Sequence, residues 1–140
     1  HIFIGSDDRQ LHAINMNTGR TAWKFETADA IRSTPFLHNS MVYTGCESGD
    51  FSAIDFRGEL MWRFHSKRAV TSSATGTDQT VYFASVDSTL YALDQANMRV
   101  LRIKRGDAGP SVWLSGDASA GSGYRWSALS VELPVRSIFL

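Results

Sequence analysis

Short blocks of alternating large and small or polar residues run along most of the chain, with the period of two that is typical of β-strands. Leu11-His12-Ala13-Ile14 shows this alternation, and residues 51–54 and 90–93 repeat it. A segment rich in β-branched and aromatic residues precedes each block, as at 2–4 and 81–83. Polar turns containing Gly, Asn and Asp follow, and the helical period of 3.6 is absent. The pattern therefore predicts an all-β protein.

These blocks belong to an internal repeat. Residues 2–25, 42–64 and 81–104 can be aligned position by position, with a small residue, a large aliphatic and an aromatic in the same order. Trp23 and Trp62 correspond in this alignment and are 39 residues apart. Self-similarity at a fixed period of this size is the sequence signature of repeat architectures.

Each repeat contains enough strands for one blade of a β-propeller. For the first unit we predict strands at 2–4, 11–14, 21–25 and 31–37, and for the second at 42–43, 51–54, 60–64 and 70–75. Four strands in roughly 40 residues are typical of a propeller blade. The predicted fold is a partial β-propeller of four-stranded antiparallel blades, with about three blades in this chain.

The repeats are predicted to occupy residues 1–106, and the C-terminal part departs from them. The units are bounded at about 2–40, 41–79 and 80–106. Residues 107–140 are interpreted as a degenerate blade or an irregular segment, in which 111–114 are a candidate inner strand of a further blade. Because propellers have four to eight blades, we expect a larger ring, or self-association if the chain stands alone.

Residues 13–23 read Ala-Ile-Asn-Met-Asn-Thr-Gly-Arg-Thr-Ala-Trp. This stretch resembles the tryptophan-docking motif A-x-D-x-x-T-G-x-x-x-W of PQQ-like (quinoprotein-type) β-propeller repeats, with Asn15 where Asp is usual. A second copy at 53–62 is one residue shorter in the turn, and the third has Met98 and Arg102 in place of Gly and Trp. The chain resembles the non-catalytic members of that family in particular, including the outer-membrane assembly lipoprotein of Gram-negative bacteria.

The resemblance implies which residues hold neighbouring blades together. In the family, the Trp docks on the adjacent blade, the small Ala lets large groups approach the sheet, and the Gly supplies the turn conformation. The blade-docking residues that it implies are Ala13, Gly19, Trp23, Ala53, Gly58, Trp62 and Ala92. Since the third unit lacks the Trp, we expect its last strand to be a solvent-facing outer strand.

We find no sequence signal for a catalytic, cofactor-binding or metal site, and we predict no cofactor. Cys46 is the only cysteine, which excludes an intramolecular disulfide and a cysteine-based zinc site, and we expect it to be buried. The four histidines show no ligand spacing. Acidic residues recur in equivalent turns, at Asp7-Asp8, Glu47 and Asp87, which favours capping of turn amides over metal binding.

Charge and hydropathy narrow the choice of partner. Fourteen Lys and Arg residues balance fourteen Asp and Glu residues, so nothing recommends a nucleic acid or an anionic membrane surface as the partner. No apolar run is long enough to span a membrane.

The repeats are regular and lack the long insertions on which active sites are often built. We therefore expect a non-catalytic scaffold that presents propeller loops to a protein partner. Two alternatives stay open: a fragment of a PQQ-dependent dehydrogenase whose active-site residues lie outside this chain, and the sensor domain of a kinase. The resemblance alone favours a periplasmic or cell-envelope location.

Overall fold

The computed structural model describes residues 1–95, 100–106 and 109–115, with side-chain positions for 1–95. Within these residues twelve strands form three antiparallel sheets. Sheet 1 contains β1 (Ile2–Gly5), β2 (Gln10–Ile14) and β3 (Thr21–Glu26). Sheet 2 contains β4 (Phe36–His38), β5 (Met41–Gly45), β6 (Asp50–Asp55) and β7 (Leu60–His65). Sheet 3 contains β8 (Thr75–Gly76), β9 (Thr80–Ser85), β10 (Thr89–Asp94), β11 (Val100–Gly106) and β12 (Gly109–Ser115).

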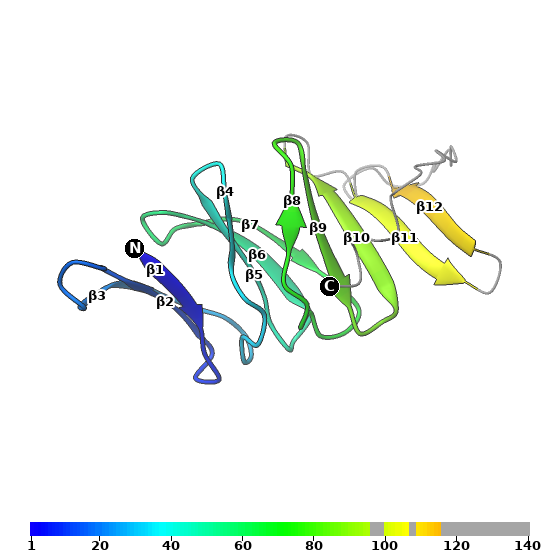
Figure 1. The fold of residues 1–140 in the computed structure, drawn as a ribbon. Coiled ribbons are helices and arrows are strands. Elements are labelled where there is room, and N and C mark those ends of the chain that lie inside the picture. Colours follow the sequence, from blue (N-terminus) through cyan, green and yellow to red (C-terminus); the bar gives the residue numbers. More distant parts are fainter. Residues whose placement is uncertain (96–99, 107–108, 116–140) are drawn as a thin grey trace.

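The sheets follow one another in chain order, from β1–β3 at the left to β12 at the right (Figure 1). In every sheet each strand pairs with the next strand along the chain, so all pairings are antiparallel and local. This up-and-down arrangement of successive small sheets is that of propeller blades. The prediction of an all-β partial propeller with about three blades is confirmed.

The first strand of each later sheet is shorter than the sequence pattern predicted. The segments at 31–37 and 70–75 become β4 and β8, of three and two residues. The Ser33 hydroxyl donates to the carbonyl of Gly45 and accepts from the same residue's N–H, at 3.1 and 3.2 Å. Ser72 makes the same two bonds with Ala84, at 2.9 and 2.8 Å. A side chain thus replaces the backbone ladder at this end of both sheets.

Two expectations for the end of the third repeat are wrong. Residues 111–114 do not begin a further blade, because β12 pairs with β11 as the fifth strand of sheet 3. For the same reason β11 lies between β10 and β12 and is not an outer strand. The register also places Leu101, and not Arg102, opposite Ala92, because the turn has the shorter length of the second copy.

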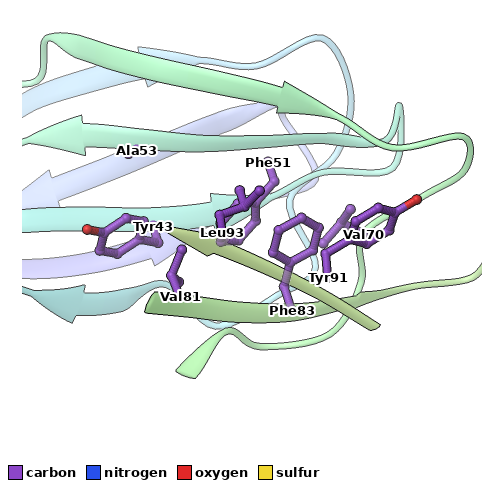
Figure 2. Close-up of a cluster of buried hydrophobic side chains, with 8 residues drawn as sticks. All are labelled: Tyr43, Phe51, Ala53, Val70, Val81, Phe83, Tyr91 and Leu93. Carbon is purple, nitrogen blue, oxygen red and sulfur yellow. The ribbon is translucent and has the colours of Figure 1, made fainter. Parts of the chain in front are cut away.

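The hydrophobic core consists of two clusters, one at each sheet-to-sheet interface. The first interface joins sheets 1 and 2, with Leu11, Ile31, Val42, Cys46 and Ile54 buried and Phe3, Trp23 and Phe25 packed against them. The second joins sheets 2 and 3, with Tyr43, Phe51, Ala53, Val70, Val81, Phe83, Tyr91 and Leu93. Figure 2 shows this second cluster, in which the rings of the two sheets face one another. Cys46 is buried, as predicted.

Glycine is required where the connecting segment crosses the sheet. A Cβ on Gly45 would lie 2.7 Å from the carbonyl oxygen of Val70, which belongs to the segment between sheets 2 and 3. The residue without a side chain therefore lets this segment contact the sheet directly. In the described part of the chain, no helix is long and apolar enough to cross a membrane.

Candidate blade-docking site

Each sheet contains a cross-strand row with a small alanine between two larger residues. The rows are Phe3–Ala13–Trp23, Tyr43–Ala53–Trp62 and Tyr82–Ala92–Leu101. In the first two rows both aromatic rings lean over the alanine. The ring centroids of Phe3 and Trp23 are 5.6 Å apart, and those of Tyr43 and Trp62 are 5.8 Å apart. Ala13 and Ala53 are fully buried under these rings. Only a small side chain leaves room for two aromatic rings to meet above the middle strand.

Trp23 extends from sheet 1 onto the β6–β7 turn of sheet 2. Its indole Nε1–H donates to the Phe56 carbonyl at 2.9 Å. The ring also lies against Gly58, where a Cβ would come within 2.9 Å of the Trp23 Cδ2 atom. Gly58 has a φ of 92°, a conformation that favours glycine. The sequence motif therefore brings together residues of two different repeats.

Trp62 occupies the corresponding place in sheet 2. Its ring contacts Tyr43 and Phe51 and packs against the second core cluster. The turn of sheet 3 that corresponds to the Gly58 turn includes residues 96–99, which lie outside the described residues. Trp23 and Trp62 are each partly buried, with the outer strands β3 and β7 exposed on the opposite side.

The turns that carry the glycines are closed by a polar side chain at their first residue. The Asn15 side-chain oxygen accepts from the N–H groups of Asn17 and Thr18. Asp55 accepts from the N–H groups of Arg57 and Glu59 in the second copy. The Glu59 N–H, followed by the Arg57 side chain and N–H, lowers the pKa of Asp55 below its usual range. Asn in place of Asp thus preserves the turn without the charge.

At the opposite end of the sheets, acidic residues cap the first turn of the repeat. Asp8 accepts from the N–H of Gln10, and Asp87 from that of Thr89. The predicted capping role is confirmed for these two residues. Asp7 and Glu47 instead form ion pairs with Arg32, each at 3.3 Å.

Asp87 also accepts a hydrogen bond from the Tyr91 hydroxyl, at 2.7 Å. Partial burial raises the pKa of Asp87, but the bonds from Tyr91 and Thr89 lower it more, so the pKa lies below its ordinary value. In the first repeat, His12 occupies the place of Tyr91 and contacts Asp8 at 3.0 Å. The two repeats therefore stabilise the same turn with different partners.

Several interface contacts were missed from the sequence. Phe56 stacks on Phe3, with 5.6 Å between ring centroids. At the corresponding place between sheets 2 and 3, the Tyr43 hydroxyl donates to Gln95, at 2.9 Å. Because these residues belong to variable turn and strand positions of different repeats, the repeat pattern alone gives no signal for their pairing.

Backbone hydrogen bonds also join the sheets. The Glu47 N–H donates to the Ala30 carbonyl, and the Val86 N–H donates to the Ala69 carbonyl, both at 3.0 Å. The described residues contain no group of three or more His, Cys, Asp and Glu side chains that could hold a metal ion. The contacts described above join the sheets by packing and hydrogen bonding.

Successive antiparallel sheets that pack on one another through Trp23 and Trp62 of their outer strands define a β-propeller repeat protein of the quinoprotein type. Comparison with known sequences is more specific, because the sequence model described as outer membrane protein assembly factor BamB matches residues 7–121. The chain belongs to this family.

Individual relatives agree with the family. The chain is similar to outer membrane protein assembly factor BamB of Salmonella typhimurium, with 25% identity over 81% of this chain and 29% of that protein. It is also similar to quinoprotein alcohol dehydrogenase PedH of Pseudomonas putida, with 30% identity over 44% of this chain and 12% of that protein. The chain thus spans less than a third of the curated relatives that it matches.

A solved structure shows the same fold. The crystal structure of BamB from Moraxella catarrhalis superimposes with a TM-score of 0.65 at 18% sequence identity. The match covers 80% of this chain and 39% of that chain. At this level of identity the likeness supports the propeller fold alone.

Proposed function

We propose that the chain supplies consecutive blades of a larger β-propeller, which acts as a non-catalytic scaffold and presents its turns to a protein partner. The repeats at 1–106 are the units of this ring, and β12 adds a strand to the last of them. The observation that carries the proposal is the Trp23 contact, in which one repeat is completed by the turn of the next.

In this proposal the seven residues of the repeated motif hold the blades together and take no part in catalysis. They are Ala13, Gly19, Trp23, Ala53, Gly58, Trp62 and Ala92. The turns at both ends of the sheets are closed by their own capping side chains, such as Asp55 and Asp87. Rigid turns on a scaffold of this kind are well suited to protein recognition.

The family relationship suggests the partner and the location. The Salmonella relative is an outer membrane protein assembly factor by name. By analogy, the whole protein would bind another component of that assembly process in the periplasm or cell envelope.

Site-specific photocrosslinking in the full-length protein tests this role. Lys67 and Arg57 are exposed and lie at opposite ends of sheet 2. Crosslinking from one end to a component of the outer membrane protein assembly machinery supports the proposal and identifies the presenting end. Absence of any such adduct at both ends, with the full-length protein folded and correctly located, contradicts it.

A quinone-dependent alcohol dehydrogenase remains the second candidate, because the similarity to PedH covers part of the repeats. In that case the catalytic residues would lie in other blades of the full-length protein. Reconstitution of the full-length protein with PQQ and calcium distinguishes the two functions. Cofactor absorbance together with alcohol oxidation would establish the enzyme and exclude the scaffold proposal.

A further inference from the structure

The outer edges of sheets 1 and 2 are open, whereas that of sheet 3 is covered. In the described part of the chain, no strand pairs with the outer side of β3 or β7. In sheet 3, β12 pairs with the outer side of β11 (Figure 1). Since the sheets stack through their faces, a further sheet in the stack would leave these edges open.

The backbone groups of two residues of β7 point away from sheet 2. The Ser66 N–H donates to the Gly49 carbonyl, so these residues form a hydrogen-bonded pair. Hydrogen-bonded and non-hydrogen-bonded pairs alternate along an antiparallel ladder. The N–H and C=O groups of Arg63 and His65 therefore point to the outer side, where they are available to an added strand.

The charged side chains of β7 are held by the adjacent strand. Charged residues on an edge strand normally discourage a foreign strand. The carboxylate of Asp50 on β6 lies 3.8 Å from the Arg63 guanidinium and 2.8 Å from the His65 ring. In sheet 1 the residue opposite Glu26 is Gln10, which supplies no charge. The β7 edge is therefore better suited than the β3 edge to accept a strand.

The apolar side chains of β7 favour the same edge. Leu60 and Met61 are 42% and 53% exposed. β3 begins instead with a threonine and an alanine, at 21–22. Farther along β7, Trp62 and Phe64 pack on the second core cluster but are only partly buried. Aliphatic side chains of an added strand, placed in the same cross-strand rows, would cover the exposed parts of these rings.

The outer edge of sheet 3 corresponds in register to that of sheet 2. The pairings of β10 with β11 and of β6 with β7 place Arg102 and Lys104 where sheet 2 has Arg63 and His65. β12 pairs antiparallel with this edge along its whole length. An edge with this backbone pattern and basic residues at the same two places thus accepts an added strand within the chain itself.

The sequence of β12 defines the chemistry of such a strand. It reads Gly-Pro-Ser-Val-Trp-Leu-Ser and contains no charged residue. Trp113 lies opposite Arg102, and the aliphatic residues Val112 and Leu114 flank it. By register, these two aliphatic residues belong to the rows that contain Phe64 and Trp62 in sheet 2.

We propose that the outer edge of β7 binds an extended, uncharged segment of a partner protein as a fifth strand of sheet 2. The segment pairs antiparallel with the backbone of Arg63 and His65. It places an aromatic residue opposite Arg63, where a ring and a guanidinium attract one another, and aliphatic residues beside Trp62 and Phe64. This edge is separate from the turns at the ends of the sheets, so the proposal does not depend on the scaffold function.

A second copy of the chain is a poorer occupant of this edge. Two β7 strands paired antiparallel would bring the basic residues Arg63 and His65 of both copies together, and like charges directly opposite destabilise a sheet. The β12 strand of a second copy already pairs with its own β11. The edge therefore favours a segment from a different protein.

A synthetic peptide tests the proposal. The probe has the sequence of residues 109–115, acetylated and amidated, and is titrated into the full chain by NMR. We expect saturable binding with a Kd between ~10 µM and ~1 mM. At saturation, hydrogen exchange of the Arg63 and His65 amides should slow at least ~10-fold. That of Phe64, whose N–H already faces β6, should change less than ~2-fold.

Backbone changes separate strand pairing from simple adhesion. N-methylation of the probe's tryptophan removes an N–H that faces β7 and should weaken binding at least ~10-fold. N-methylation of its leucine, whose N–H faces away, should weaken binding less than ~2-fold.

Proline variants of the chain provide a second pair. Arg63→Pro removes an outward N–H from β7, a place where an edge strand tolerates proline, and should abolish binding of the probe. Lys24→Pro at the corresponding place of β3 is the matched control and should leave binding unchanged. Circular dichroism checks that both variants are folded.

Three results would overturn the proposal. One is the absence of probe binding at ~1 mM, above the expected Kd range. Another is binding that both N-methylated probes weaken equally, or that leaves exchange of the Arg63 and His65 amides unchanged. The third is self-association of the chain at ~10–100 µM that Arg63→Pro abolishes, because a second copy would then occupy the edge.

Discussion

The two sheet-to-sheet interfaces share one backbone geometry but differ in chemistry. At the first interface, the face of sheet 2 contributes the small polar residues Thr44 and Ser52, both buried. At the second, the same positions of sheet 3 are Phe83 and Tyr91. Phe83 stacks on Phe51 with only 3.9 Å between ring centroids, and the Tyr91 ring lies 5.2 Å from that of Phe83 (Figure 2).

This difference shows that the repeat fixes the docking at the edges and leaves the centre free to vary. Trp23 and Trp62 take equivalent places at the outer strands. The centre is polar at the first interface, where the Thr44 hydroxyl is buried without a hydrogen-bond partner among the described residues. It is aromatic at the second interface. We therefore expect the second interface to contribute more to stability.

The largest expected effect is at the aromatic centre. Phe83→Ala should lower the free energy of unfolding by about 3–5 kcal/mol, because it removes a fully buried ring. Urea unfolding followed by circular dichroism measures this loss. Thr44→Ala at the corresponding position should cost at least ~2 kcal/mol less, and an equal loss for both variants would contradict the proposed asymmetry.

Trp23 separates the contribution of the ring from that of its hydrogen bond. Trp23→Ala should cost about 3 kcal/mol, near the lower end for Trp→Ala, because the ring is only partly buried. Trp23→Phe keeps an aromatic ring over Ala13 but removes the donor to the Phe56 carbonyl, and should cost about 1 kcal/mol. If both variants lose less than ~0.5 kcal/mol in urea unfolding, the turn contact does not hold the sheets together.

The polar centre of the first interface should tolerate the loss of its hydroxyl. Thr44→Val removes a buried polar atom without a described partner and should stabilise the chain by about 1 kcal/mol. Thr27→Val is the matched control, because the Thr27 hydroxyl contacts the carbonyls of Arg9 and Asp29 at 3.0 and 2.8 Å. Thermal unfolding of both variants measures the two effects, and the control should be destabilised. Destabilisation by Thr44→Val as well would contradict the conclusion that the Thr44 hydroxyl is buried at a cost.

The smallest effect concerns the charged turn of the second interface. Since the folded-state pKa of Asp87 lies below its ordinary value, the ionised carboxylate stabilises the fold above about pH 4. This contribution is lost as the pH falls through the folded-state pKa. Asp87→Asn should cost a few tenths of a kcal/mol at pH 7 and nothing at low pH, measured as unfolding against pH. If the difference in unfolding free energy between Asp87→Asn and the unsubstituted chain does not change with pH, the charge of Asp87 does not stabilise the fold.

The sequence predicted the part of the structure that depends on local periodicity. Strand alternation predicts that Ala13 lies between two large residues. Turn chemistry predicts the glycine turn at Gly58. The hydrogen bond between Tyr43 and Gln95 could not be predicted in this way, because the two residues are 52 positions apart and lie in different sheets. The sequence did not predict that Leu101 pairs with Ala92. The third copy of the motif lacks the glycine and the tryptophan, so nothing in it marks that its turn is one residue shorter than the first.

The shortness of β4 has a consequence for how the molecule avoids unwanted pairing with other chains. Exposed edge strands offer free N–H and C=O groups on which a foreign strand can grow into an aggregate. The Ser33 hydroxyl forms hydrogen bonds with both the N–H and the C=O of Gly45. Pro35 has no N–H, which removes a donor just before β4. The inner edge of sheet 2 is therefore left with only three residues, too few to serve as a template, and Ser72 gives sheet 3 the same protection.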